Sequence, residues 1–132
     1  RVKRDIPGFI GNRLQHALWR EAIALVEAGV CTARDVDTVV KTTLGLKLQV
    51  LGPLENADLV GTDLTLAIHE YVLPHIDSRA EPSPLLRRLV EQGDLGMKSG
   101  GGFRSWTKEE AQAVRDRLFD HLLVVTREEV RT

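Results

Sequence analysis

The chain has 132 residues, of which 42% are hydrophobic and 28% are charged, the composition of one globular domain large enough to bury a core. Its 18 basic and 19 acidic side chains leave a formal net charge of −1, a balance that gives no indication of binding to nucleic acid or to an anionic membrane. No apolar run reaches the roughly 20 residues that a membrane-spanning helix needs. The single cysteine, Cys31, has no partner for an internal disulfide, so we expect a cytoplasmic location.

A long helix is predicted between Pro7 and Gly29. Pro7 suits the entry of a helix and Gly29 suits its exit. Trp19 and Ile23 add a second apolar stripe to the first, so we expect this helix to be central and packed on more than one side. The first stripe recurs at helical spacing and consists of Ile10, Leu14, Ala17, Leu18, Ala22, Leu25 and Val26.

The next helix is predicted to begin with a variant of the capping box. Thr32 is its N-cap and Asp35 lies in its first turn, and Gly45 is expected to end it. Residues 46–51 alternate weakly between apolar and polar, but they stand alone. We interpret them as an ordered connector rather than as sheet.

Five segments complete the chain. Helices are predicted over residues 53–60 and 62–76, and a third over residues 84–92, capped by Ser83. Residues 94–106 have no period and read as a glycine-rich loop, after which a capping box at residues 107–110 opens a last helix that ends near Arg127. The predicted fold is therefore an all-α domain of five or six helices over residues 7–132.

Two polar residues in the first turns of the leading helix are candidate site residues. Free backbone N–H groups and the positive end of the helix dipole favour an acceptor-rich ligand beside Asn12 and Arg13. Gly8 and Gly11 leave the backbone there open to close approach. The alternative is structural: Asn12 caps or bonds back to the helix, and Arg13 is solvated.

The motifs of this chain resemble, in order, those of the C-terminal domain of the 3-hydroxyacyl-CoA dehydrogenases, including the 3-hydroxybutyryl-CoA enzymes. The resemblance covers about residues 4–106. It starts with Pro7 to Leu14, continues with Glu21-Ala22 and with Gly29 to Asp37, and extends to Gly45, Leu51 to Leu54, Asp58 to Asp63, Pro82 to Pro84 and Gly96 to Phe103.

The resemblance implies a fold like the C-terminal domain of 6-phosphogluconate dehydrogenase. It implies oxidation of (S)-3-hydroxyacyl-CoA to 3-oxoacyl-CoA with NAD, which a separate N-terminal dinucleotide-binding (Rossmann) domain holds together with the catalytic His and Glu. Residues 1–6 would then be the remnant of the interdomain connection, and residues 7–132 the substrate-cleft and dimerisation domain of a homodimer, inactive alone. Asn12 would orient the acyl-CoA substrate, and Phe9 and Ile10 would line the acyl pocket, with packing in the core of the domain as the alternative for these two residues.

Other candidate chemistry has less support. The loop Gly96 to Phe103 lacks the strand and helix that flank a dinucleotide fingerprint, so we expect close chain packing there, with Phe103 and Trp106 as anchors. The four histidines form no recognisable metal cluster, and we predict no metal site. Glu21 is expected to be a structural partner of an Arg or of a backbone group.

Two other functions fit the same sequence. One is the same domain of a related sugar-acid dehydrogenase acting on L-gulonate. The other is a non-enzymatic helical dimerisation module, in which Asn12 is only a cap.

Overall fold

The computed structural model describes residue 4 and residues 6–129, with the backbone alone for residues 127–129. These residues are helical or form loops, and their only bridges are isolated ones within residues 96–105, which confirms the all-α class. The chain divides into unit 1, Arg1–Leu86, and unit 2, Arg87–Thr132. The expected interdomain remnant, residues 1–6, lies largely outside the described residues.

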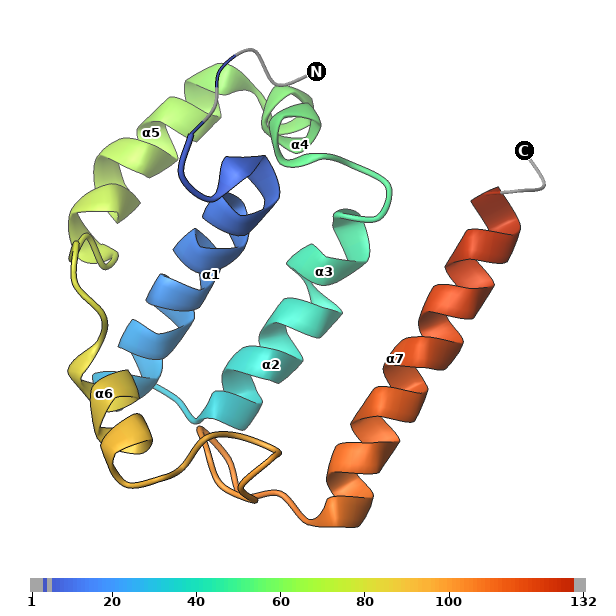
Figure 1. Ribbon diagram of the computed structural model, residues 1–132. Helices are drawn as coiled ribbons and strands as arrows, with labels where there is room; N and C mark the ends of the chain where they lie inside the picture. Colours follow the sequence, from blue (N-terminus) through green and yellow to red (C-terminus); the bar gives the residue numbers. More distant parts are fainter. Residues whose placement is uncertain (1–3, 5, 130–132) are drawn as a thin grey trace. The chain divides into compact units, whose positions relative to one another are not determined.

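Unit 1 contains five α-helices and the start of a sixth (Figure 1). Helix α1 contacts α2, which continues into the single turn of α3, and α4 contacts α5. Within the described residues, no Cα atom of α1 lies within 8 Å of a Cα atom of α5. The elements are α1 Phe9–Glu27, α2 Ala33–Thr42, α3 Leu44–Lys47, α4 Pro53–Val60, α5 Thr62–Val72, a 3-10 turn at Leu73–His75, and α6 Pro84–Glu91.

The predicted starts of α2 and α6 are confirmed by their hydrogen bonds, whereas α1 begins at Phe9, two residues after the predicted entry at Pro7. In α2, the Asp35 N–H donates to Thr32 Oγ1 (3.2 Å) and the Thr32 N–H donates to Asp35 Oδ2 (2.9 Å), which is a reciprocal capping box. In α6, the backbone N–H of Leu85 donates to Ser83 Oγ (3.1 Å). These bonds satisfy donors that have no partner within the helix.

Two predicted helix ends are wrong. Gly45 does not end a helix, because α2 ends at Thr42 and Gly45 lies inside α3. A Cβ at Gly45 would lie 2.8 Å from the Val40 carbonyl oxygen, so this glycine permits close approach of the chain to α2. The helix expected to reach Ile76 ends at Val72, because Pro74 has no N–H to continue the ladder.

The first half of α1 is open to solvent. Every residue from Phe9 to Arg20 is exposed, including Trp19 at 48%, whereas Glu21 to Glu27 are half-buried. Ala111, at 3% exposure, is the one buried apolar residue of the described chain. The expected central helix is therefore packed only along its second half.

Unit 2 contains the glycine-rich loop and helix α7, Lys108–Glu129. The capping box that opens α7 is confirmed, with the Thr107 N–H donating to Glu110 Oε2 (2.9 Å) and the Glu110 N–H donating to Thr107 Oγ1 (3.1 Å). The helix runs slightly beyond the predicted end at Arg127. Across the described residues, no helix combines the length and hydropathy that a bilayer crossing requires.

Candidate functional site

The entry to α1 has an unusual backbone. Gly8, the N-cap residue, has a φ of 80°, and Phe9, which follows it, has a φ of 48°. Glycine adopts this left-handed region readily, but an aromatic residue does so only at a cost in strain. The Phe9 N–H donates to the carbonyl oxygen of Ile6 (3.1 Å) and closes the turn. Such strain is found mainly where the chain positions functional groups.

Asn12 lies in the second turn of α1 with its side chain exposed. The N-cap of α1 is Gly8, without any side-chain capping bond, so Asn12 is not the cap. Among the hydrogen bonds of the described residues, none involves the Asn12 side-chain amide. This amide therefore keeps its donors and its acceptor available to a ligand or to another polypeptide.

The neighbours of Asn12 are equally open. Phe9 is 58% exposed and Ile10 is 56% exposed. A Cβ built on Gly11 would meet no atom within 4 Å, so the backbone there is accessible, as expected from the sequence. The Arg13 guanidinium donates to the carbonyl oxygen of Pro7 (3.4 Å), a contact that holds this turn together.

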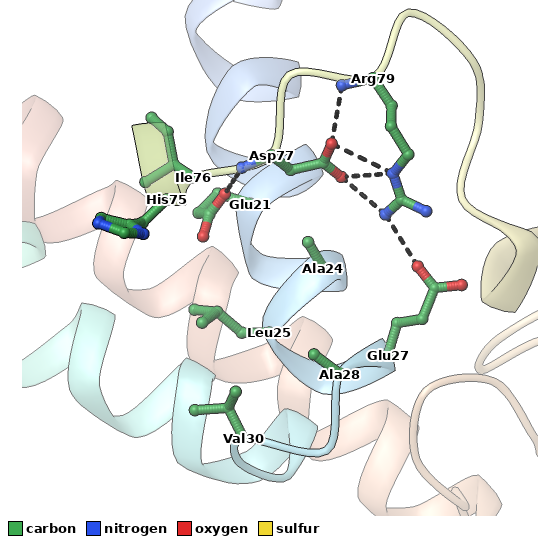
Figure 2. Close-up of a pocket in the computed structure, with 10 residues that line it drawn as sticks. All are labelled: Glu21, Ala24, Leu25, Glu27, Ala28, Val30, His75, Ile76, Asp77 and Arg79. Carbon is green, nitrogen blue, oxygen red and sulfur yellow. Dashed lines mark hydrogen bonds and ion pairs between the residues drawn. The ribbon is translucent and has the colours of Figure 1, made fainter. Parts of the chain in front are cut away.

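A separate cavity of about 360 Å³ lies beside the second half of α1 (Figure 2). Its polar wall is a cluster that we call the clasp, formed by Glu21, Glu27, Asp77 and Arg79. The Asp77 N–H donates to Glu21 Oε2 (2.6 Å), and Arg79 Nη2 donates to Asp77 Oδ2 (2.7 Å) and to Glu27 Oε2 (2.8 Å). The apolar wall consists of Ala24, Leu25, Ala28, Val30 and Ile76, and His75 completes the lining.

The clasp ties the connector after α5 to α1. Glu27 also accepts the N–H of Leu85 (3.0 Å) and so joins the end of α1 to the start of α6. The hydrogen bonds and positive charge of Arg79 hold the pKa values of Asp77 and Glu27 below their ordinary range, and the two carboxylates raise the pKa of Arg79. Each of the four residues bonds at least one other member of the cluster, so we interpret the clasp as structural.

The prediction for Glu21 as a structural partner is confirmed by its bond to the backbone of Asp77. The sequence analysis did not single out the other members of the clasp. Glu27 and Arg79 are separated by 52 positions in sequence, and no motif connects them. Only the fold brings them together.

The glycine-rich loop of unit 2 uses its polar groups internally. Ser99 Oγ accepts the N–H of Leu95 (2.8 Å) and lies 2.9 Å from the Gly101 carbonyl oxygen, to which it donates. The Gly96 N–H donates to the Gly101 carbonyl oxygen (2.6 Å). These bonds support chain packing rather than phosphate binding.

The two aromatic anchors of this loop differ in burial. Phe103 is 43% exposed, whereas Trp106 is half-buried and lies under the Arg104 guanidinium, whose central carbon is 4.5 Å from the ring centre. This stacking is a cation–π contact. In the part of the chain that the structure describes, no three His, Cys, Asp or Glu side chains gather as metal ligands.

The helical domain with an exposed Pro-Gly-Phe-x-x-Asn-Arg turn at its first helix corresponds to a known domain of dehydrogenases. The sequence model of the 3-hydroxyacyl-CoA dehydrogenase C-terminal domain matches residues 8–106. The chain belongs to this family.

Two curated relatives illustrate the match. The chain is 43% identical over 100 residues to a probable 3-hydroxybutyryl-CoA dehydrogenase of Deinococcus radiodurans, covering 75% of this chain and 35% of the relative. It is 34% identical over 126 residues to 5-formyl-3-hydroxy-2-methylpyridine 4-carboxylate 5-dehydrogenase of Mesorhizobium japonicum, covering 96% of this chain and 41% of the relative. The chain thus spans well under half of each relative.

A solved structure shares the helical arrangement. The chain aligns with a crystal structure of a 5-formyl-3-hydroxy-2-methylpyridine 4-carboxylic acid 5-dehydrogenase, described as an NAD+-dependent dismutase, with a TM-score of 0.90 and 34% identity. The alignment covers 96% of this chain and 41% of that one. The fold implied by the sequence resemblance is therefore confirmed.

Proposed function

We propose that this chain is the C-terminal domain of an NAD-dependent (S)-3-hydroxyacyl-CoA dehydrogenase, in which it completes the substrate cleft. The observation that carries the proposal is the exposed, unpartnered Asn12 amide within the family motif at the entry of α1. An amide in that position is ready to donate to a substrate oxygen. In this proposal, the strained turn at Gly8 and Phe9 orients the Asn12 amide toward the substrate.

The proposed division of labour follows from the chemistry of the reaction. Oxidation transfers a hydride from C3 of the acyl-CoA to NAD, and a base takes the hydroxyl proton. Both NAD and the base belong to the N-terminal Rossmann domain in this proposal. Asn12 orients the acyl oxygens from the opposite side, and Phe9 and Ile10 supply apolar contacts to the acyl chain.

The test is Asn12→Ala in the full-length protein that contains this chain. A well-placed donor of this kind contributes about 3 kcal/mol to transition-state stabilisation, so kcat/KM for 3-hydroxybutyryl-CoA should fall about 100-fold. The melting temperature should not fall, because Asn12 makes no capping bond and alanine is the better helix former. Gln15→Ala, an exposed polar position on the same helix, is the matched control and should leave both quantities unchanged.

The result that would overturn the active-site role is the reverse pattern. Unchanged turnover with a lower melting temperature would make Asn12 a structural residue and would favour the non-enzymatic helical module. The 132-residue chain by itself should reduce no NAD with 3-hydroxybutyryl-CoA. A rate near that of the two-domain enzyme would refute the division of labour.

A second candidate substrate class is a pyridine carboxylate. The observation that favours it is the length of the match. The family model ends at residue 106, before α7. The match to the Mesorhizobium japonicum relative extends over 126 residues, and the alignment with the crystal structure of the pyridine dehydrogenase covers 96% of this chain. Helix α7 is thus a feature shared with a pyridine dehydrogenase. Parallel assays of full-length protein with 3-hydroxybutyryl-CoA and with the pyridine substrate distinguish the two.

L-gulonate belongs in the same assay panel. In the sugar-acid alternative, the cleft beside Asn12 needs polar rather than apolar contacts. If the acyl-CoA is the substrate, replacing the apolar Ile10 by Ser should therefore raise KM for 3-hydroxybutyryl-CoA. If the sugar acid is the substrate, the same change should leave KM for L-gulonate unchanged. The partners of the domain in every enzymatic version of the proposal are its own N-terminal Rossmann domain and a second copy of the chain.

A further inference from the structure

The side of α1 that carries Asn12 continues into a pair of aromatic rings. Asn12, His16 and Trp19 have the spacing i, i+4, i+7, so their side chains leave the helix on one side. The rings of His16 and Trp19 meet edge to face, with their centroids 5.0 Å apart and their planes at 70°. We call these three residues the ring face. The contact between its two rings orients both of them one to two turns beyond the Asn12 amide.

The polar atoms of the ring face have no partner in the described chain. Among the hydrogen bonds of the described residues, none involves the Asn12 amide, the His16 imidazole or the Trp19 indole N–H. All three side chains are exposed, Trp19 at 48%. Aromatic rings that bring an apolar body and an unused polar atom to the surface are typical of a binding site.

The charged residues around the ring face are basic. Arg13 lies three residues before His16 and Arg20 lies four residues after it, so both are its neighbours on the helix surface. Neither arginine forms an ion pair with another described residue, and residues 9–20 contain no Asp or Glu. A ligand that contacts this part of α1 is therefore favoured if it carries a negative charge.

We infer that the substrate contacts of the proposed dehydrogenase extend from Asn12 to His16 and Trp19, and that these two residues select an aromatic carboxylate over an acyl-CoA. This inference rests on the proposed function and specifies the pyridine carboxylate as the substrate class of its site. The Trp19 ring packs against the flat pyridine ring, and the His16 imidazole donates to the carboxylate. A 3-hydroxybutyryl group has neither a ring nor a carboxylate and leaves both contacts unused.

The spacing of the two polar side chains suits this substrate. Residues at i and i+4 on a helix have Cβ atoms about 5–6 Å apart, so Asn12 and His16 can reach substituents on neighbouring ring atoms. The compound named for the Mesorhizobium japonicum relative has a 5-formyl group and a 4-carboxylate, which are neighbours on the pyridine ring. Asn12 then orients the formyl oxygen, and His16 holds the carboxylate beside it.

The test compares KM and kcat of full-length variants for 5-formyl-3-hydroxy-2-methylpyridine 4-carboxylate and for 3-hydroxybutyryl-CoA. His16→Leu removes the donor and should raise KM for the pyridine compound about 10-fold, whereas His16→Gln keeps a donor and should restore most of the loss. Trp19→Leu should raise the same KM about 5-fold. None of these changes should raise KM for 3-hydroxybutyryl-CoA. His69→Leu, at an exposed histidine of α5, is the matched control and should change neither KM.

Hydroxyl-radical footprinting of the unmodified full-length protein keeps the inference testable if a variant does not fold. The probe is pyridine-4-carboxylate, which has the ring and the carboxylate but no group to oxidise. It should protect Trp19 from labelling. Trp106, in the loop of unit 2, should be labelled equally with and without the probe.

Three results would overturn the inference. The first is a His16→Leu variant whose KM for the pyridine compound equals that of the control. The second is an equal rise of KM for both substrates, which would remove the selectivity. The third is a Trp19 that stays fully reactive at saturating pyridine-4-carboxylate. The effect of Asn12→Ala on turnover of 3-hydroxybutyryl-CoA is measured separately, so the proposed dehydrogenase activity can hold when this inference fails.

Discussion

Two glycine-to-alanine changes in the turn that carries Asn12 should have opposite effects on stability. Gly8 has a φ of 80°, and an added Cβ would lie 3.3 Å from Cγ of Arg13. An L-residue in the left-handed region is less stable by about 1–2 kcal/mol, which outweighs the roughly 0.4–1 kcal/mol gained from a stiffer unfolded chain. Gly8→Ala should therefore destabilise the protein by about 1 kcal/mol.

Gly11→Ala is the matched change three residues later. Gly11 lies inside α1, and its added Cβ would meet no atom within 4 Å. Alanine in a helix interior is favoured over glycine by about 0.5–1 kcal/mol, so this variant should be more stable than the starting protein. The same methyl group narrows the approach to the backbone beside Asn12, and turnover in the full-length enzyme should fall although stability rises.

Thermal unfolding followed by circular dichroism measures both variants in one experiment. A change of 1 kcal/mol corresponds to about 3–5 °C in a domain of this size, downwards for Gly8→Ala and upwards for Gly11→Ala. A Gly8→Ala variant with an unchanged or higher melting temperature would refute the left-handed entry to α1. A Gly11→Ala variant with unchanged turnover would refute ligand approach at that point.

Three further predictions concern the rest of the fold. The hydrogen bond from Arg79 lowers the pKa of Glu27 in the folded protein from its ordinary value of 4.5. The stability that the ionised Glu27 adds is therefore present above pH 4.5 and is lost as the pH falls through its lower pKa in the folded state. Glu27→Gln should accordingly reduce the fall of the melting temperature at acid pH. Thr32→Ala removes the N-cap of α2 and should cost about 1 kcal/mol in urea unfolding. In Gly102→Ala the new Cβ would lie 2.9 Å from the Gly96 backbone, and in Gly101→Ala it would lie 2.6 Å from the Asp94 side chain. Because a side chain can move aside more easily than the backbone, Gly102→Ala should lower the melting temperature more than Gly101→Ala.

A contrary result in each case is equally clear. An acid limb that is the same with and without the Glu27 carboxylate would show that the contact between Glu27 and Arg79 adds no pH-dependent stability. Equal loss in the two loop variants would show that the backbone approach at Gly102 is not tighter than the side-chain contact at Gly101. An unchanged urea midpoint for Thr32→Ala would contradict the capping bond.

The local structure was predictable because it depends on interactions a few residues apart. The capping boxes at Thr32 and Thr107, the N-cap at Ser83 and the helical class all follow from side chains bonding to nearby backbone groups. The ends of α2 and α5, at Thr42 and Val72, were less predictable. A glycine marks either a stop or a close approach, and only the position of the Val40 carbonyl distinguishes the two.

The sequence by itself determined the helices, the family and the turn that presents Asn12, because each is encoded in a short run of residues. The tertiary structure alone decided that Glu27 and Arg79 meet across 52 positions and that α1 is half open instead of central. It also decided that Leu14 and Ile68 stand exposed, on two helices with no Cα atoms within 8 Å of each other in the described chain. An apolar stripe in the sequence predicts that one face of a helix is covered. Only the packing in three dimensions shows whether the same chain covers that face.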